Sequence, residues 1–330
     1  MEKDNGTARH TIHVVNPAAG KGGASVIAAK ENARATGGEV YVTKRKGDAE
    51  DYIRAVCSNH AKNAGTSNGS GEIHFIVYGG DGTIYEAVNG IMKADAGKFA
   101  VLSAVPFGSG NDFVRGANRT DVYSVDENKP QKAEKWIDVI AFTNERGERK
   151  YSANMINVGF DCSVAAKASE MKKKPLVSGT SAYILGVLNV LIRKKPLNCR
   201  IEIETADGNV EKMSGKYLLT AIGNSIYCGG GFRGATAAKL DDGLIDALIV
   251  NNLTRIQFMA LVKDYRDGTH ADSDTGELAE KFRNIMTYRK CKKISMYGIS
   301  QICADGEIEN SVKLDAEIVP QAMRYALTQF

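Results

Sequence analysis

The chain has 330 residues, of which 43% are hydrophobic and 25% are charged. This composition is close to the average of globular proteins, so it excludes a disordered chain, a collagen-like repeat and a disulfide scaffold, and the length favours about two domains. The formal net charge of +4 is too small for a surface built to hold nucleic acid, so we expect no nucleic-acid partner.

The start of the chain and its cysteines indicate a cytoplasmic protein. Residues 1–9 are polar and charged and lack the apolar core of a secretion signal. The six cysteines are scattered, without a C-x-x-C pair or a histidine at zinc-finger spacing, so we expect free thiols rather than disulfides or zinc. The longest apolar stretch, residues 183–192, is far shorter than the roughly 20 residues that span a bilayer, so no transmembrane helix is expected.

The first part of the chain alternates predicted strands and helices. Short β-branched or apolar runs lead into turns and then into stretches of good helix formers. This alternation predicts an α/β domain with a mostly parallel sheet and helices on both faces. The predicted strands are 11–15, 39–43, 73–78 and 99–105, and the predicted helices are 24–35, 49–61 and one that begins at 79–83.

From about residue 135 the pattern becomes β-rich. Several strand candidates follow one another without a helix between them, which predicts an antiparallel domain. The predicted strands are 136–142, 150–158, 199–205, 212–223, 244–250 and 292–296, and the predicted helices are 162–173, 182–193 and 256–264.

The run Gly-Gly-Asp-Gly-Thr at 79–83 lies where a strand meets a helix N-terminus, the place at which open α/β sheets bind ligands. Glycines there let the backbone approach a phosphate, and the helix start offers free N–H groups. Asp81 cannot hold a phosphate itself, since like charges repel, so it indicates a bridging cation such as Mg²⁺ on a nucleoside triphosphate. The alternative is a tight turn in which Asp81 or Thr83 only caps the helix.

Two further loops follow predicted strands of the same sheet. Residues 16–23 form a glycine-rich turn that lacks the Gly-Lys-Ser/Thr ending of a P-loop and the spacing of a dinucleotide fingerprint. Residues 106–112 carry small hydroxyl and amide groups that can reach phosphate oxygens. Three such loops at one sheet edge indicate a phosphate site more strongly than any one of them.

Together these loops resemble the diacylglycerol kinase catalytic family, the lipid kinases that include sphingosine and ceramide kinases and the soluble bacterial lipid kinases. The resemblance covers nearly the whole chain. The 79–83 run is shared with NAD kinases, whereas the ordered set of motifs is specific. The matching elements are Asn16-Pro17 with Gly20, 79–83 with Glu86 and Asn89-Gly90, 106–112, 157–161, 229–231, 242–246 and 305–307.

The resemblance implies a two-domain kinase. Its α/β domain, similar to those of NAD kinases and diacylglycerol kinases, covers residues 1–134 with a return strand at 319–330 and binds ATP. An antiparallel, sandwich-like domain covers 135–318, and the lipid hydroxyl enters from the cleft between the two. By match of motif, the residues that line the nucleotide are Asn16, Thr43, Gly79, Gly80, Asp81, Gly82, Thr83, Ile84, Tyr85 and Ser109.

Two acidic positions in the second half gain roles from the same resemblance. Asp305 aligns with the family's proposed general base, and phosphoryl transfer needs a carboxylate within hydrogen-bond reach of the accepting hydroxyl. From the residues alone, Asp-Gly at this point predicts a hairpin turn. The resemblance also implies a structural Mg²⁺ on the Asp242 carboxylate with the carbonyls of Lys239 and Leu244.

Positive charge is concentrated in one window. Residues 167–200 contain eight basic residues and one acidic residue, so the rest of the chain is net negative. The apolar stretch 183–192 lies inside this window, and we expect it to pack against the second domain while the flanking basic residues face an anionic membrane. The alternative is that these basic ends are merely solvated.

Together, these features predict an ATP- and Mg²⁺-dependent lipid kinase. It would transfer the γ-phosphate of ATP to a hydroxyl of a membrane lipid, with diacylglycerol as the first candidate and phosphatidic acid as its product. We expect a cytoplasmic protein that binds the inner membrane surface peripherally. The alternatives are a soluble NAD-kinase-like enzyme and a nucleotide- or lipid-binding protein that has lost catalysis. The sequence identifies neither the lipid substrate nor the oligomeric state, and it is compatible with a homodimer.

Overall fold

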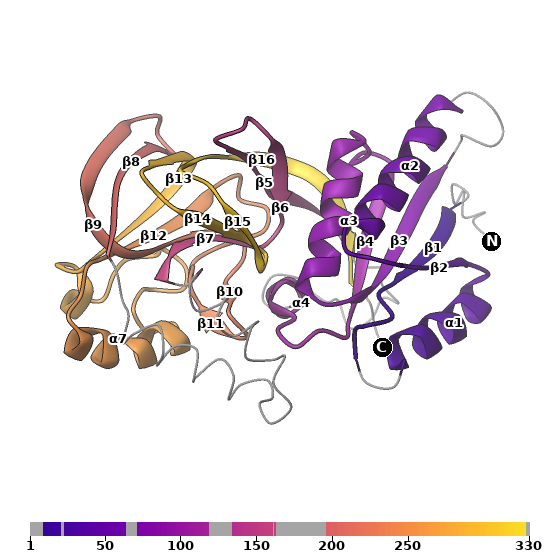
Figure 1. The fold of residues 1–330 in the computed structure, drawn as a ribbon, viewed down its shortest axis with the longest axis horizontal. Coiled ribbons are helices and arrows are strands. Elements are labelled where there is room, and N and C mark those ends of the chain that lie inside the picture. The colour runs from indigo at the N-terminus through magenta and orange to yellow at the C-terminus, as the bar shows by residue number, and fades with distance from the viewer. Residues whose placement is uncertain are drawn as a thin grey trace, which may run out of the picture. The chain divides into compact units, whose positions relative to one another are not determined.

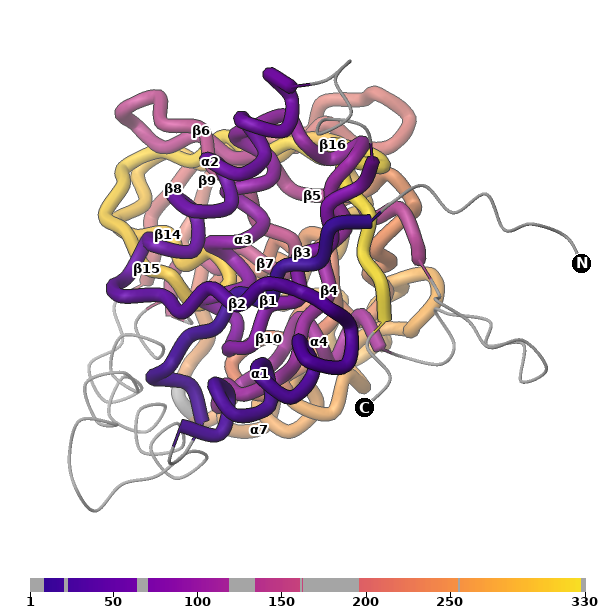
Figure 2. The backbone as a smooth tube through the Cα atoms, turned by 90° about the vertical axis from the view of Figure 1, so that its right-hand side faces the viewer, coloured from indigo at the N-terminus to yellow at the C-terminus, as the bar shows by residue number. Residues whose placement is uncertain are grey.

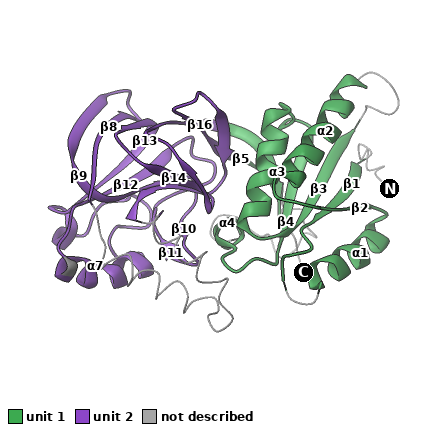
Figure 3. Ribbon diagram, in the orientation of Figure 1, with its two compact units in different colours: residues 1–137, 321–330 green, residues 138–320 purple. Residues whose placement is uncertain are grey.

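A computed structural model describes residues 9–20, 23–63, 71–118, 134–160, 162 and 196–327. The chain divides into two compact units: unit 1 is 1–137 with 321–330, and unit 2 is 138–320 (Figure 3). The predicted helix at 182–193, nearly all of that at 162–173 and the basic residues from Lys167 to Lys195 lie outside the described residues. Among the described helices, none is long and apolar enough to cross a membrane.

Unit 1 is built on a parallel sheet with the strand order β2-β1-β3-β4-β16, to which the end of β16 (Lys313–Ala326) contributes. Its four pairings are all parallel, which confirms the predicted α/β fold. Helix α1 covers one face of the sheet, and α2 and α3 cover the other (Figure 2). In chain order the elements are β1 (Arg9–Val15), α1 (Ala24–Thr36), β2 (Glu39–Val42), α2 (Asp48–Lys62), β3 (Glu72–Gly79), α3 (Asp81–Lys93), β4 (Ala100–Pro106) and α4 (Asp112–Ala117), as Figure 1 shows.

The core of unit 1 explains why these segments form these elements. Strand β4 is buried from Ala100 to Val105, as expected for a parallel strand covered on both faces. Helix α3 buries the side chains that the sequence spaces at helical intervals, from Ile84 to Ile91. Gly90 allows α2 to approach α3, because an added Cβ would lie 2.9 Å from the backbone of Glu50 and from Ile53.

Unit 2 is β-rich, and every described pairing within it is antiparallel, as predicted. The long strands β9 and β13 each pair with β12 over one half and with β8 over the other. The elements are β5 (Glu134–Asn144), β6 (Arg149–Ser152), β7 (Met155–Gly159), β8 (Leu197–Thr205), β9 (Val210–Gly223), β10 (Tyr227–Cys228), β11 (Phe232–Arg233), β12 (Ile245–Asn251), α7 (Arg255–Asp267), β13 (Met286–Tyr297), β14 (Gln301–Ala304), β15 (Glu307–Asn310) and β16 (Lys313–Ala326). A short 3₁₀ helix, Glu280–Phe282, precedes β13.

Two strands differ from the sequence prediction. The predicted strand 150–158 is divided into β6 and β7, because the N–H groups of Ala153 and Asn154 bond to the Asp305 carboxylate instead of a neighbouring strand. The return strand β16 starts at Lys313 rather than near 319. Its first part pairs with β13 in unit 2, and Arg324 and Tyr325 pair with β4 in unit 1.

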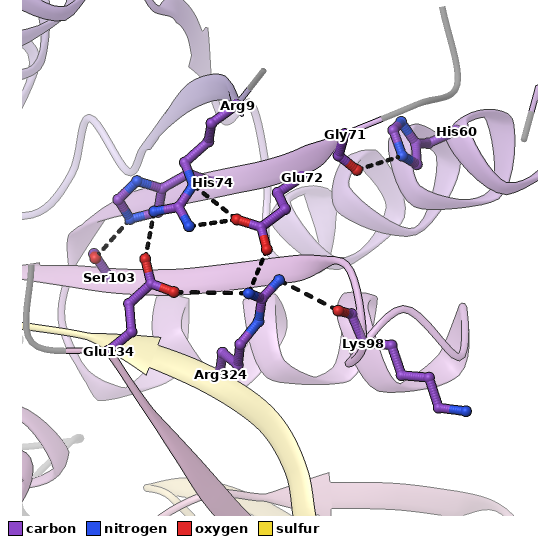
Figure 4. Close-up of polar contacts among 9 residues, drawn as sticks. All are labelled: Arg9, His60, Gly71, Glu72, His74, Lys98, Ser103, Glu134 and Arg324. Atoms are coloured by element: carbon purple, nitrogen blue, oxygen red, sulfur yellow. Dashed lines mark hydrogen bonds and ion pairs between the residues drawn. The ribbon is translucent and has the colours of Figure 1, made fainter. Parts of the chain in front are cut away.

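Four charged side chains connect three strands of unit 1 with the start of β5 (Figure 4). Glu72 on β3 accepts hydrogen bonds from Arg9 on β1 and Arg324 on β16, and Glu134 pairs with both arginines. Burial alone would raise the pKa of Glu72, but the two arginines more than offset burial and lower it. The charged carboxylate therefore helps to hold the last strand in place.

Replacing Glu72 with glutamine is expected to lower the free energy of unfolding by about 1–2 kcal/mol, because two charge-assisted hydrogen bonds lose their anion. Urea unfolding at pH 7 measures this loss. The matched control is Glu39→Gln, whose partner is His10 and whose side chain is 66% exposed, so its loss should stay under about 0.5 kcal/mol. Equal losses in the two variants would contradict a role for this partly buried network.

A buried histidine makes the stability of unit 1 depend on pH. His13 lies fully buried on β1, with Nδ1 3.0 Å from the Tyr78 hydroxyl and Nε2 3.1 Å from Thr36 Oγ1. Burial lowers the pKa of His13 below its usual 6.5. The unfolded chain therefore binds a proton that the folded state excludes, so this contribution to stability is complete above about pH 6.5 and declines below it.

We expect the urea midpoint of the wild type to decrease when the pH is lowered from 7.5 to 5.5. In His13→Gln this decrease should be smaller. His10→Gln, at a half-exposed position on the same strand, should keep the wild-type dependence. If His13→Gln and His10→Gln fell by the same amount, the assignment to His13 would be wrong.

Candidate nucleotide and phosphoryl-transfer site

The turn between β3 and α3 is built for close backbone approach. Gly80 precedes α3 without a side-chain cap, and an added Cβ there would lie 2.8 Å from the Cα of Gly108 in the loop after β4. The Phe107 N–H donates to the Gly79 carbonyl at 2.8 Å, which joins the same two loops. The predicted loops 79–83 and 106–112 therefore lie in contact at the carboxyl ends of β3 and β4.

Asp81 binds the second loop rather than capping its own helix. Its Oδ1 accepts the N–H of Phe113 at 3.2 Å, at the start of α4. Burial raises the pKa of Asp81, while backbone N–H groups of Asn111, Asp112 and Phe113 oppose that shift. The carboxylate holds the loop of Ser109 in a fixed position against the N-terminus of α3.

The loop after β1 joins the same place through Asn16. Its Nδ2 donates to Thr83 Oγ1 at 3.1 Å, and Thr83 is buried at the first turn of α3. Thr43 is also buried, and its N–H donates to the Val15 carbonyl at 2.8 Å, next to Asn16. All three predicted glycine-rich loops thus meet at one edge of the sheet.

The other predicted nucleotide residues differ in exposure. The side chain of Ile84 is 2% exposed and belongs to the core, so only its backbone can face a ligand. Gly82 and Tyr85 are half-buried, and Ser109 is exposed. Asn111 was not among the predicted site residues, yet it shapes this loop: it adopts φ 54°, and its Oδ1 accepts the Gly108 N–H at 2.9 Å. Asparagine is a residue that adopts this left-handed conformation readily, which is the signal that could have identified it.

The edge offers the groups that a nucleoside triphosphate requires. The backbone of Gly80 and the N-terminus of α3 can receive phosphate oxygens. The Asp81 carboxylate and the Ser109 hydroxyl are oxygen donors of the kind that Mg²⁺ accepts, and Asp81 is tied to the segment that follows Ser109, so these residues fit a Mg²⁺ carried by the nucleotide.

Asp305 lies in unit 2, at the turn between β14 and β15. Asp305 and Gly306 have φ of 48° and 90°, so the Asp-Gly pair forms the hairpin turn that the residues predict. Asp305 is 7% exposed, and its carboxylate accepts four hydrogen bonds: from Ser152 Oγ at 2.6 Å and from three backbone N–H groups of 153–155 at 2.9–3.3 Å. These four donors fix the direction of the carboxylate.

The candidate metal residues lie in the loop before β12. Leu244 N–H donates to Asp242 Oδ1 at 3.1 Å, and the ammonium of Lys290 on β13 lies 3.0 Å from Asp242 Oδ2. The same ammonium lies 3.0 Å from Oδ2 of Asp246. The Asp242 carboxylate is thus already paired with a positive charge, which would repel a divalent cation bound to the same group. The set of Lys239, Asp242 and Leu244 therefore does not fit a divalent cation in this arrangement.

The charged groups around Lys290 differ in burial: Asp246 is fully buried, whereas Asp242 and Lys290 are partly exposed. Burial raises the pKa of Asp246 to about 6, and the neighbouring Lys290 opposes that rise. Burial also acts to lower the pKa of Lys290, but the two carboxylates more than offset it and raise the pKa. Lys290 therefore stays an ammonium at neutral pH.

Two family models match the chain. The diacylglycerol kinase catalytic domain matches residues 10–142, and the YegS C-terminal NAD kinase β-sandwich-like domain matches residues 154–327. The chain belongs to the diacylglycerol kinase catalytic family. The resemblance inferred from the ordered loops is confirmed, and so is the fold of a mostly parallel α/β domain with a sandwich-like second domain.

Individual relatives in the family agree with this assignment. A protein of Xanthomonas oryzae pv. oryzae named "Probable lipid kinase YegS-like" is 30% identical over 64% of this chain, and the match spans 63% of that relative's length. One of the same name from Alcanivorax borkumensis is 29% identical over 88% of this chain and 87% of its own. The chain thus spans less than two thirds of the length of the Xanthomonas relative.

A solved structure shows the same fold. The crystal structure of a diacylglycerol kinase from Bacillus anthracis str. Sterne is 19% identical, with a TM-score of 0.57 over 96% of both chains.

Proposed function

We propose that this protein is an ATP-dependent lipid kinase that transfers the γ-phosphate of ATP to a hydroxyl of a membrane lipid. Diacylglycerol is the first substrate to test, with phosphatidic acid as product. The observation that carries this function is the meeting of three glycine-rich loops, tied by Asn16 to Thr83 and by Asp81 to Phe113, in a chain of this family. Its relatives are named lipid kinases.

Each group at the sheet edge has a proposed role. The backbone at Gly79 and Gly80 and the start of α3 bind the phosphates, and Ser109 donates its hydroxyl to a phosphate oxygen. Asp81 keeps the loop of Ser109 in position through Phe113. Mg²⁺ bound with the nucleotide would neutralise charge on the triphosphate.

The proposed proton acceptor is Asp305. As the lipid hydroxyl oxygen bonds to the γ-phosphorus, the bond from that phosphorus to the β,γ-bridging oxygen breaks and ADP leaves. The hydroxyl proton passes to the Asp305 carboxylate, which four donors hold in one direction. The basic residues between Lys167 and Lys195 are proposed to contact an anionic membrane surface, where the substrate resides.

Transfer from γ-labelled ATP tests this function. The protein is incubated with Mg²⁺ and mixed micelles of diacylglycerol, and separately with NAD. Label in the lipid and none in NAD is the expected result. Label in NAD alone would instead support an NAD kinase, whose Gly-Gly-Asp-Gly-Thr run this chain shares. ATP binding without transfer to either would support a protein that has lost catalysis.

A further inference from the structure

Three oxygens from residues 237–246 of unit 2 surround the ammonium of Lys290. They are Oδ2 of Asp242 at 3.0 Å, Oδ2 of Asp246 at 3.0 Å and the Ala237 carbonyl at 3.1 Å. A lysine ammonium has three donors, so each oxygen can receive one. Two carboxylates and a carbonyl are also the oxygen ligands that a divalent cation such as Mg²⁺ takes in proteins.

The cluster is built from partly and fully buried groups rather than from a surface ion pair. Asp246 is fully buried, and the side chains of Asp242 and Lys290 are 22% and 23% exposed. The other oxygen of Asp246 accepts the Tyr288 hydroxyl at 2.8 Å, and that hydroxyl accepts the Ala237 N–H at 3.0 Å. The ammonium, the hydroxyl and the two carboxylates thus form one network that joins β12 and β13 to the segment before them.

The residues that the family resemblance assigns to a structural Mg²⁺ belong to this same loop. Asp242 supplies the only side-chain ligand of that predicted set, and its two oxygens already receive Leu244 N–H and Lys290. A divalent ion bound to Asp242 Oδ2 would stand close to the ammonium, and the two positive charges would repel each other. In the described residues no group of three His, Cys, Asp or Glu side chains is placed to hold a metal ion.

We propose that the Lys290 ammonium is a built-in cation that takes the place of a divalent metal ion at the Asp242–Asp246 loop. The loop is then held closed by a side chain of the protein, and the fold of unit 2 is independent of divalent cations. This inference does not depend on the lipid kinase activity.

Thermal unfolding of chelator-treated, nucleotide-free protein with and without millimolar Mg²⁺ tests the proposal. Mg²⁺ binding at this loop would make the Mg²⁺-dependent rise in Tm larger in the wild type than in Asp242→Asn. We expect the rise to be the same in the two proteins. A rise that is lost in Asp242→Asn would overturn the proposal, and this measurement needs no variant of Lys290 to fold.

Lys290→Met gives a second, opposite expectation. Without the ammonium, the two neighbouring carboxylates lack a positive charge, and Tm in chelator should fall by on the order of 10 °C. Added Mg²⁺ should restore part of that loss, and the double variant Lys290→Met/Asp242→Asn should show no restoration. Lys293→Met, on the same strand with a half-exposed side chain, is the matched control and should change Tm little in either buffer. An unchanged Tm for Lys290→Met, or a lowered Tm that Mg²⁺ does not raise, would overturn the proposal.

Discussion

Asp305→Asn is expected to lower kcat for lipid phosphorylation by about 10²–10⁴-fold, because the variant lacks the carboxylate that would accept the hydroxyl proton. The affinity for ATP should stay within about twofold, since the proposed role of Asp305 is to accept the proton of the lipid hydroxyl and not to bind the nucleotide. Steady-state kinetics with varied ATP and lipid measure the two effects separately.

A purely structural role for Asp305 makes a different prediction. The carboxylate accepts hydrogen bonds from Ser152 Oγ and from three backbone N–H groups. The NH₂ group of asparagine would place a donor against these donors, which should lower the free energy of unfolding by about 1–3 kcal/mol. Ser152→Ala is the matched control, because it removes one donor and keeps the carboxylate. If both variants lost stability and their kcat fell only with the folded fraction, Asp305 would be an anchor of the β6–β7 turn and not the base.

Gly80→Ala is expected to weaken ATP binding by at least about 10-fold and to lower kcat by about 100-fold. Its Cβ would lie 2.8 Å from the Cα of Gly108, so two backbone segments must separate. A displacement near 1 Å at a reacting phosphate is worth about this factor in rate. The reciprocal change, Gly108→Ala, brings its Cβ to 2.4 Å from the Gly80 Cα and should have the same effect.

The matched control for Gly80→Ala is Gly215→Ala in β9, because neither glycine has a positive φ. There the added Cβ would meet only the side chain of Tyr217, at 3.3 Å, which can adjust. ATP affinity and kcat of this variant should match the wild type. Normal nucleotide binding in Gly80→Ala would show that the contact between the two loops is not needed for the nucleotide site.

The sheet of unit 1 and its three loops could be predicted because their signals are local. A β-branched run followed by glycines and a helix-forming stretch defines a strand, a turn and a helix within about 20 residues of chain. Parallel strands then bring their carboxyl ends to one edge, so the sequence predicts that residues 16–23, 79–83 and 106–112 meet there. The Asp-Gly turn at Asp305 was predicted for the same reason, because its left-handed backbone is a property of two adjacent residues.

The partners of the key side chains could not be predicted in this way. Asp81 binds the Phe113 N–H, 32 residues away, whereas the sequence indicated a bridging cation or a cap for its own helix. Lys290 lies 48 residues from Asp242, and no spacing rule connects the two. The only local signal was the spacing of Tyr288 and Lys290, which are two residues apart and so lie on one face of a strand. The hydroxyl of Tyr288 and the ammonium of Lys290 both contact Asp246. The division of the predicted strand 150–158 has the same origin, because it depends on a carboxylate more than 150 residues further along the chain.

The most direct test of the proposed function is transfer of label from γ-labelled ATP to a total lipid extract. The wild-type protein with Mg²⁺ is predicted to label a lipid that migrates with phosphatidic acid, and Asp305→Asn is predicted to leave it unlabelled. A different labelled lipid would retain the kinase and change its acceptor. No labelled lipid from folded wild-type protein that binds ATP would contradict the account.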